Sequence, residues 1–369
     1  MTQATFFDPP EFRGRDAWAQ ESVTSSETTL QAQMGKVFGY LKGMHATHLM
    51  DIGVKLGMFA QLTKASSGLT PHALAAELHL DPKYVRLWCE TACALELLDY
   101  DPSTGYRPAP GMEQILGEPE STYYLGGFPD IHLLITRDYA RYPELFRTGG
   151  LYTYQEHDAV FLRSVAEATC VLPRMFLGAV LPNLPRLQAT LESGATILEV
   201  GCGAGYAMVD MAERYPNVRC VGIEIEPHSV QMAQELIGTR GLGSRVEVRH
   251  MDGADVPPDF AGAFDLVTSF LVLHEIRPDQ KHAVLEQCVR ALRPDGTLLL
   301  FDERYPSNPG ELRDPAQIYA VMAQWYEMTW GNIINTKEEI HAMLAEQGMR
   351  IVDETSLSRF YILTAEKNH

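Results

Sequence analysis

Hydrophobic and polar positions change their spacing at about residue 190. Before that point apolar residues recur every third or fourth position, as between Met34 and Leu62, which is typical of amphipathic helices. From about Thr196, short unbroken apolar runs alternate with helical patterns. Unbroken runs are typical of parallel strands, because crossover helices cover both faces of such a sheet. The pattern predicts an α/β protein: a Rossmann-like doubly wound sheet over 191–369, with an antiparallel hairpin at its edge, preceded by a mostly helical part.

The helical part contains a helix, a turn, a second helix and a hairpin. Thr70 and Pro71 start the first helix, Pro82 starts the second, and the segment 100–110 has the composition of a tight hairpin. This order is that of a winged helix, so we predict a winged-helix-like domain over 34–120. Residues 1–33 are predicted to be an N-terminal arm, and the aromatic-rich residues 121–190 a helical connector.

Charge argues against DNA as the partner of this winged helix. The chain has 48 acidic and 30 basic residues, a formal charge of -18. The second helix carries Lys83 and Arg86 but also Glu90, Glu96 and Asp99. A helix with that balance is repelled by the phosphates of the groove. We therefore expect no nucleic-acid partner, while a winged-helix regulator that binds DNA or senses a ligand stays open as an alternative.

Other classes of protein are disfavoured by composition. No run approaches 18 apolar residues and no signal-peptide core is present, so we expect no membrane span. The six cysteines are scattered without a CxxC pair, which indicates free thiols in a reducing cytoplasm. Possible metal ligands are His45 and His48 near Asp51, and His274-Glu275 with His341. Neither set has a closed ligand count, so we predict no metal site.

A glycine-rich loop follows the first strand of the predicted sheet, with the sequence Glu199-Val-Gly201-Cys-Gly203-Ala-Gly205. A loop between a strand and a helix is the context in which backbone approaches a nucleotide. A dinucleotide fingerprint would place its third glycine at residue 206, which is Tyr206. The carboxylate of Glu199 also suits a cationic amino-acid group better than a pyrophosphate.

Acidic residues also end the next two predicted strands. Glu224 follows VGI, and Asp252 follows RHM. An acid in the position of Glu224 binds ribose hydroxyls in doubly wound folds, and Asp252 is placed to accept from an adenine amino group. The carboxyl ends of parallel strands meet at one edge of the sheet. We therefore expect one nucleoside-binding crevice there.

Residues 196–303 resemble the class I S-adenosylmethionine-dependent methyltransferases through ILEVGCGAG, VGIE, RHMDG, FDLVTSFLVLHEI and LRPDGTLLL. With its helical first half, the chain resembles the small-molecule O-methyltransferases of plant and bacterial natural-product pathways. The resemblance implies a cytoplasmic homodimer that acts on a small molecule, with S-adenosyl-L-methionine as cofactor. The N-terminal domain would dimerise and close over the substrate. The residues that would hold the cofactor are Glu199, Gly201, Gly203, Gly205, Glu224 and Asp252.

The candidate general base is His274, just past the fourth predicted strand. An imidazole titrates near pH 6.5 and can take the proton of a phenol. The resembled family has His-Asp-Trp here, whereas this chain has His274-Glu275-Ile276. That family places one orienting acid at the end of the fifth strand, where Asp302 stands. It places another before the penultimate helix, where residues 334–336 of this chain contain no acid.

Two further expectations concern the substrate. The insertion 305–335 is rich in methionine and aromatic residues, so it is either a helix that packs on the core or a cap over a flat aromatic substrate. The missing acid leaves room for an alternative, C-methylation of an activated phenol ring such as that of a tyrosine-like precursor. The sequence favours transfer to a hydroxyl but leaves oxygen, carbon and nitrogen open.

Overall fold

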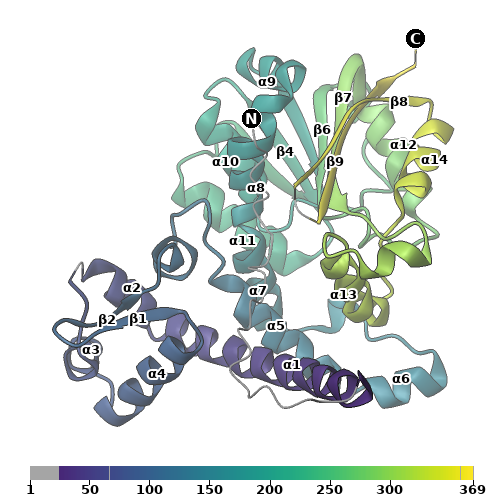
Figure 1. Cartoon of the computed structure of the whole chain (residues 1–369). Helices are drawn as coiled ribbons and strands as arrows, with labels where there is room; N and C mark the ends of the chain where they lie inside the picture. The colour runs from purple at the N-terminus through teal and green to yellow at the C-terminus, as the bar shows by residue number, and fades with distance from the viewer. Residues whose placement is uncertain (1–24, 66, 358, 369) are drawn as a thin grey trace. The chain divides into compact units, whose positions relative to one another are not determined.

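The computed structural model describes residues 25–65, 67–357 and 359–368, which divide into two compact units (Figure 1). One unit comprises residues 25–137 and 167–171, and the other comprises 138–166 and 172–368. The division cuts through the predicted connector 121–190. Residues 1–24 of the predicted arm lie outside the described residues, but 25–33 are helical, because no proline or glycine interrupts them.

The first unit contains the predicted helix, turn, helix and hairpin. Thr70 and Asp81 cap the two helices, accepting from Ala73 N at 3.2 Å and Lys83 N at 2.8 Å. The second helix ends at Ala94, earlier than predicted, because Glu96 takes a left-handed conformation (φ 62°). The elements are α1 (Ser25–Lys55), α2 (Met58–Lys64), α3 (Pro71–Leu78), α4 (Pro82–Ala94), β1 (Leu98–Asp101), β2 (Gly105–Pro108), η1 (Glu113–Gly117) and α5 (Gly127–Asp138).

Short helices follow in the aromatic-rich segment. They are α6 (Tyr142–Thr148), η2 (Tyr154–Glu156), α7 (Ala159–Thr169), α8 (Val171–Met175), η3 (Phe176–Val180), η4 (Leu181–Asn183) and α9 (Pro185–Glu192). Within the described residues, one helical stretch, 159–183, is long and apolar enough to cross a membrane. The absence of long unbroken apolar runs predicted no membrane span, because polar residues interrupt this stretch. Because 56% of its apolar window is buried inside the structure, it is weak evidence for a membrane.

The second unit is built on a seven-stranded sheet in the order β5-β4-β3-β6-β7-β9-β8. The first five are parallel, and β9 pairs antiparallel with both β7 and β8, as predicted. The strands are β3 (Thr196–Val200), β4 (Arg219–Glu224), β5 (Val246–His250), β6 (Phe264–Phe270), β7 (Leu292–Glu303), β8 (Met349–Leu357) and β9 (Phe360–Lys367).

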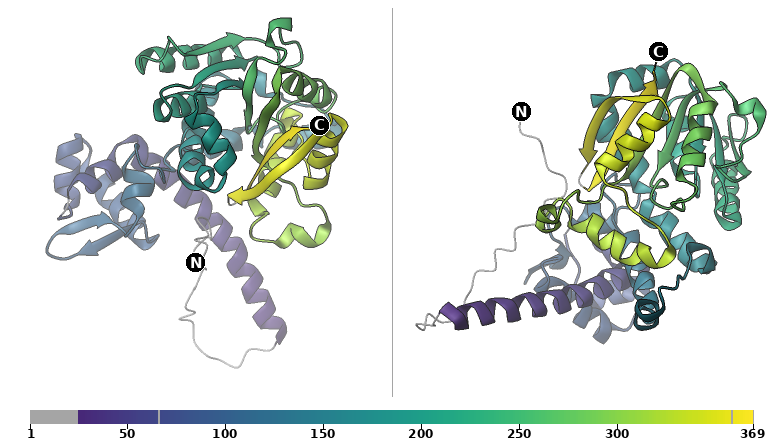
Figure 2. Two further views of the ribbon diagram at one scale, coloured as in Figure 1. Left: turned by 90° about the horizontal axis from the view of Figure 1, so that it is seen from above. Right: turned by 90° about the vertical axis from the view of Figure 1, so that its right-hand side faces the viewer.

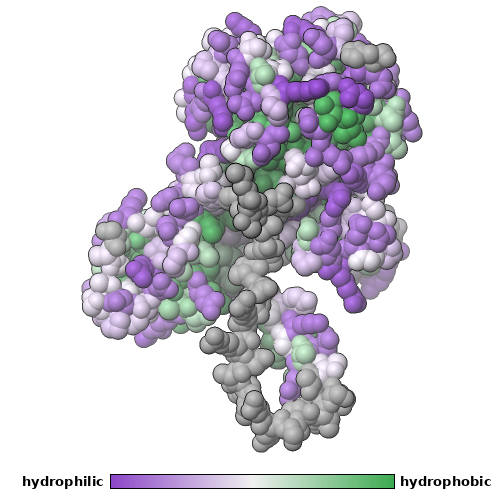
Figure 3. All heavy atoms as spheres, turned by 45° about the horizontal axis from the view of Figure 1, so that its top comes forward, coloured by the Kyte–Doolittle hydropathy of each residue, from purple (hydrophilic) through white to green (hydrophobic). Residues whose placement is uncertain are grey.

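Helices cover both faces of this sheet, which confirms the doubly wound fold. Figures 1 and 2 show α10 (Tyr206–Arg214) and α11 (Pro227–Thr239) on one side, and α12 (Lys281–Ala291) and α14 (Lys337–Glu346) on the other. A buried apolar core lies between sheet and helices, and hydrophilic residues cover most of the face in Figure 3. The strand order reverses at β3, between β4 and β6, and ligands of such sheets bind at the carboxyl ends of the strands beside this point.

The insertion after β7 contains a helix with two different sides. It comprises η6 (Pro309–Arg313), α13 (Ile318–Glu327) and η7 (Met328–Trp330). Ala320, Ala323 and Glu327 of α13 are buried, whereas Met322 and Trp325 are exposed. The helix therefore packs on the unit through one side, as the first of the two expectations for 305–335 proposed, and carries a single acid into the interior.

Candidate active site

The glycine loop after β3 depends on its glycines for conformation and for space. Gly201, Gly203 and Gly205 all have positive φ (67°, 52° and 80°). A Cβ on Gly201 would lie 2.5 Å from Val272 Cγ1, and one on Gly205 would lie 3.2 Å from Ala233 Cβ. At Gly203 no atom lies within 4 Å of that position. The loop is therefore tightly packed on its inner side and open at Gly203.

Glu199 lies directly beneath this loop with a carboxylate that lacks a full set of partners. It is 2% exposed, and its Oε2 has no hydrogen-bond partner among the described residues. Burial, with the nearby charges of Glu224 and Asp210, raises the pKa of Glu199 to about 8. A buried acid with an unpaired oxygen is unfavourable unless a cation or donor reaches it. The unpaired acid and the open glycine loop together fit the amino-acid group of S-adenosylmethionine.

The acids at the ends of the next two strands lie as predicted at the same sheet edge. Glu224 ends β4, and its carboxylate accepts from the backbone N–H groups of Gly203 at 2.8 Å and Glu226 at 2.9 Å. Burial raises the pKa of Glu224 even though these N–H groups lower it. Asp252 follows β5, is exposed, and accepts from Ala254 N at 2.9 Å. Glu224 is thus bonded to the glycine loop itself.

His274 is brought to this edge by a strained turn after β6. Leu271 has a φ of 56°, which is unusual for a bulky residue, and its N–H donates to Phe301 O at 2.7 Å. His274 is 5% exposed, and its Nδ1 forms a hydrogen bond with the Asp302 carboxylate. The backbone N–H of His274 donates to Asp302 Oδ2 at 3.3 Å. The structure therefore brings together the two residues predicted to be catalytic.

A second acid, which the sequence analysis missed, lies on the other side of the imidazole. Glu327 Oε2 is 3.3 Å from His274 Nε2. The family resemblance places this acid at residues 334–336, but the last turn of α13 supplies it from earlier in the chain. One signal was available: Glu327 stands alone among the apolar and aromatic residues of WYEMTW. An isolated acid in such a segment is rarely buried without a partner.

The two carboxylates determine the charge of the imidazole. Burial lowers the pKa of His274, but the charges of Asp302 and Glu327 outweigh it and hold the pKa well above 6.5. Burial raises the pKa of Glu327 to about 7, against the opposing charge of His274. The two carboxylates therefore favour the protonated form of the His274 imidazole that lies between them.

Beside this trio lie an acid and an aromatic wall. Desolvation raises the pKa of Glu275, the residue after His274, to about 8. Burial and the charges of Glu275 and Glu224 raise the pKa of Tyr154 well above 10, which places its phenol near those acids. The Tyr154 ring lies 5.9 Å from that of Trp330, so aromatic groups from η2 and η7 adjoin the acidic edge.

The metal-ligand sets considered from the sequence are not assembled. In the described ranges, no group of three or more His, Cys, Asp or Glu side chains is arranged to hold a metal ion. His341 instead forms a hydrogen bond with Tyr361 Oη at 2.7 Å, and Asp51 pairs with Lys55 at 2.9 Å.

Comparison with known proteins identifies a methyltransferase domain over residues 197–296. Nocamycin O-methyltransferase of Saccharothrix syringae is 39% identical over 134 residues, which are 35% of this chain and 45% of that protein. Ajmaline N-methyltransferase of Rauvolfia serpentina is 31% identical over 157 residues, 42% of this chain and 48% of that protein. The chain thus spans less than half the length of either relative.

The fold comparison extends further along the chain. Human N-acetylserotonin methyltransferase, solved in complex with S-adenosylmethionine, superimposes with a TM-score of 0.66 over 95% of this chain and 100% of that one, at 17% identity. At this identity the likeness concerns the fold. Residues 197–296 therefore match a methyltransferase domain, within a chain that shares its fold over 95% of its length with a solved methyltransferase.

Proposed function

We propose that this protein transfers a methyl group from S-adenosylmethionine to a hydroxyl group of a small aromatic molecule. The observation that carries the proposal is the buried Asp302–His274–Glu327 trio at the sheet edge where the glycine loop lies. When bound, the cofactor supplies an electrophilic methyl group. The chain's own residues then have to bind, orient and deprotonate the acceptor.

The residues at the ends of β3, β4 and β5 would hold the cofactor. The unpaired oxygen of Glu199 would face its amino group, and Glu224 its ribose hydroxyls. Asp252 would accept from the adenine amino group. The three loop glycines would let backbone approach the ligand, as the open position at Gly203 supports.

His274 would act as the general base. Asp302 holds Nδ1 and so orients Nε2 toward Glu327. Because the imidazole is protonated between the two acids, the trio must lose a proton before Nε2 can accept one from the substrate hydroxyl. A positioned base of this kind contributes typically 10²–10⁴ in rate.

The substrate would lie against the aromatic residues of η2 and the insertion. Tyr154 and Trp330 adjoin the acidic edge, and flat apolar pockets with few polar anchors suit aromatic ligands. Of the two relatives, the O-methyltransferase supports oxygen as the acceptor, whereas the N-methyltransferase is the reason that the test below also reads nitrogen. No observation favours the DNA-binding alternative: Arg86 of α4 pairs with Glu90 of the same helix.

The test is turnover with a panel of hydroxyaromatic compounds, read by formation of S-adenosylhomocysteine. Nuclear magnetic resonance of the product then identifies the methylated atom. Methylation of oxygen supports the proposal, whereas methylation of a ring carbon or a nitrogen would replace it by the corresponding alternative. His274→Ala should abolish most turnover while calorimetry shows cofactor binding unchanged. Full turnover by that variant would remove His274 from the mechanism.

We also propose that the protein is a homodimer that forms through α1. Large apolar side chains follow one side of this helix at helical spacing, and all are exposed in the single chain: Leu30, Met34, Val37, Phe38, Leu41 and Met44. Figure 2 shows α1 as one long continuous helix. An apolar stripe of this length is typical of a surface covered by another protein. Among the described residues the six cysteines form no disulfide, which supports the reducing cytoplasm as the compartment.

A further inference from the structure

Lys281, the first residue of α12, is buried at an unfavourable place for a lysine. It is 3% exposed, and among the described residues no carboxylate lies within ion-pair distance of its Nζ. The positive end of a helix dipole further disfavours a cation at this position. Desolvation lowers the pKa of Lys281 to about 8, although Asp302, Glu339 and Glu327 raise it. Burial of a lysine ammonium group is unfavourable unless hydrogen bonds compensate for the lost water, so the contacts of Lys281 have to explain its position.

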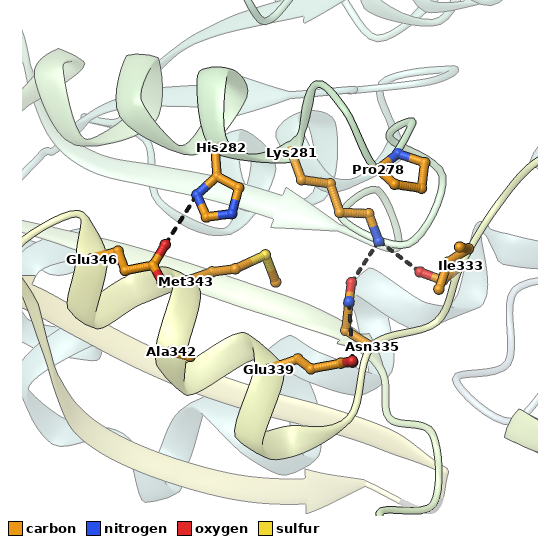
Figure 4. A pocket seen from close by; sticks show the side chains of 9 residues that line it. All are labelled: Pro278, Lys281, His282, Ile333, Asn335, Glu339, Ala342, Met343 and Glu346. Carbon is orange, nitrogen blue, oxygen red and sulfur yellow. Dashed lines mark hydrogen bonds and ion pairs between the residues drawn. The ribbon is translucent and has the colours of Figure 1, made fainter.

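The contacts of Lys281 lead to one segment of the chain. Figure 4 shows its Nζ directed at residues 333 and 335, from which it is bonded to Ile333 O at 2.6 Å and Asn335 Oδ1 at 2.5 Å. Both acceptors belong to the segment 331–336, between η7 and α14. A pocket of about 290 Å³ adjoins these contacts, so packing around Ile333 and Asn335 is incomplete, whereas Asn332 and Ile334 are buried.

The segment 331–336 connects directly to the catalytic trio. Ile333 N donates to His274 O at 3.1 Å. Asn332 Nδ2 donates to Glu327 Oε2 at 3.4 Å, and Asn332 N donates to Glu327 O at 3.2 Å. The segment therefore holds the backbone of His274 and both the backbone and carboxylate of Glu327. Lys281 binds it from the other side at Ile333 and Asn335, and Gln324 of α13 binds it at Asn332 O and Ile334 N.

We propose that Lys281 is a positioning residue of the methyltransferase site: by fastening the segment 331–336, it holds Glu327 against Nε2 of His274. The catalytic meaning of this role rests on the proposed function, but the role itself is a matter of geometry. Asp302 is held independently, through His274 N and Glu303 N. Loss of the lysine contacts should therefore release Glu327 while leaving the Asp302 side of the imidazole in place.

The first test needs no substrate. In the full chain labelled with ¹⁵N-histidine, we expect low-field N–H proton signals from both nitrogens of the His274 imidazolium, bonded to Asp302 and Glu327. In Lys281→Met, the Nε2 proton signal should disappear or move strongly upfield while the Nδ1 signal stays. Two unchanged signals would overturn the proposal. Loss of both signals would overturn it too, since Lys281 would then support the whole unit and not the position of Glu327.

The second test is a double-mutant cycle on turnover. Lys281→Met should lower kcat about tenfold, the range of a lost charge-assisted hydrogen bond, with the KM for S-adenosylmethionine unchanged. In a Glu327→Gln background the same change should have little further effect, because coupled residues are not additive. Equal effects in both backgrounds would contradict the proposal.

The chain offers a matched control and a rescue. Like Lys281, Lys367 donates an Nζ hydrogen bond to a backbone carbonyl, that of Leu292 at 2.6 Å, and Lys367→Met should leave kcat and the His274 signals unchanged. Lys281→Arg should retain most of the activity. Absence of turnover in the wild type with every compound would refute the proposed function, while the histidine signals would still decide the role of Lys281.

Discussion

At the scale of single residues, the site is defined by charges that the fold holds out of water. Glu199, Glu327 and Lys281 each have a pKa displaced toward neutrality by burial. Displaced pKa values gather at functional sites, because a group poised near neutral pH can exchange protons or bind charge. The shifted pKa of Glu199 should make stability depend on pH, and the shifted pKa values around His274 should make turnover depend on pH.

Glu199→Gln should stabilise the cofactor-free protein at alkaline pH. The folded pKa of Glu199, about 8, lies above its ordinary value of 4.5. Between these values the folded state holds a proton that the unfolded state has lost, so this residue's contribution to stability falls as pH rises through that window. Glutamine cannot ionise, so above pH 8 the variant should be more stable, by on the order of a few kcal/mol. Calorimetric unfolding in the presence and absence of cofactor measures this. Equal Tm values at alkaline pH would show that the acid is not desolvated.

Glu327→Gln should change the pH dependence of turnover. The imidazole must lose a proton before it can accept another, and the charge of Glu327 helps to hold the pKa of His274 well above 6.5. Turnover at saturating cofactor should therefore rise with pH above neutrality in the wild type. In the variant this inflection should move to lower pH, because the charge that holds the proton is gone, and the maximal rate should be roughly 10- to 100-fold lower. The initial rate as a function of pH is the measurement, and an inflection that does not move would assign it to another group.

At the scale of elements, the end of each parallel strand supplies one part of the site, and the connections decide how those parts meet. The loop after β3 bends through three left-handed glycines, and β6 ends at the strained Leu271. The insertion after β7 delivers Glu327 on the last turn of α13. Strain at these strand ends is retained because the sheet determines the positions around it.

Gly201→Ala should destabilise the sheet-containing unit more than Gly203→Ala. Both positions are left-handed, which costs about 1–2 kcal/mol for alanine. Only at Gly201 would the new Cβ meet Val272, at 2.5 Å, and overpacking adds about 1–3 kcal/mol. Denaturant unfolding of the two variants tests this difference. Equal losses would indicate that Val272 moves aside freely.

At the scale of the whole molecule, the exposed stripe of α1 is the feature that the single chain leaves unexplained. Six large apolar side chains at helical spacing are exposed along it. Their burial against a second copy would remove them from water, which is favourable by roughly 25 cal/mol per Å² of apolar surface.

Phe38→Glu combined with Leu41→Glu should convert a dimer into a monomer. The two side chains are 64% and 48% exposed, so the charges do not disturb the fold of the single chain but would be buried in the dimer. Light scattering after size-exclusion chromatography measures the mass. As a control, Tyr84→Glu on α4 changes another exposed aromatic residue and should leave the mass unaltered. A wild-type chain that is already monomeric would refute the dimer.

The sequence by itself determined the parts of this protein that depend on local pattern. Unbroken apolar runs predicted the parallel sheet, the spacing of Gly201, Gly203 and Gly205 predicted the loop, and the positions of Glu224 and Asp302 at strand ends placed them at one edge. These features follow from chain periodicity and from the common direction of parallel strands. Only the tertiary structure decided that Glu327, and not residues 334–336, faces His274, and that Lys281 fastens the segment between them. Such contacts join residues tens of positions apart through an irregular insertion, where no periodicity relates the sequence to direction in space.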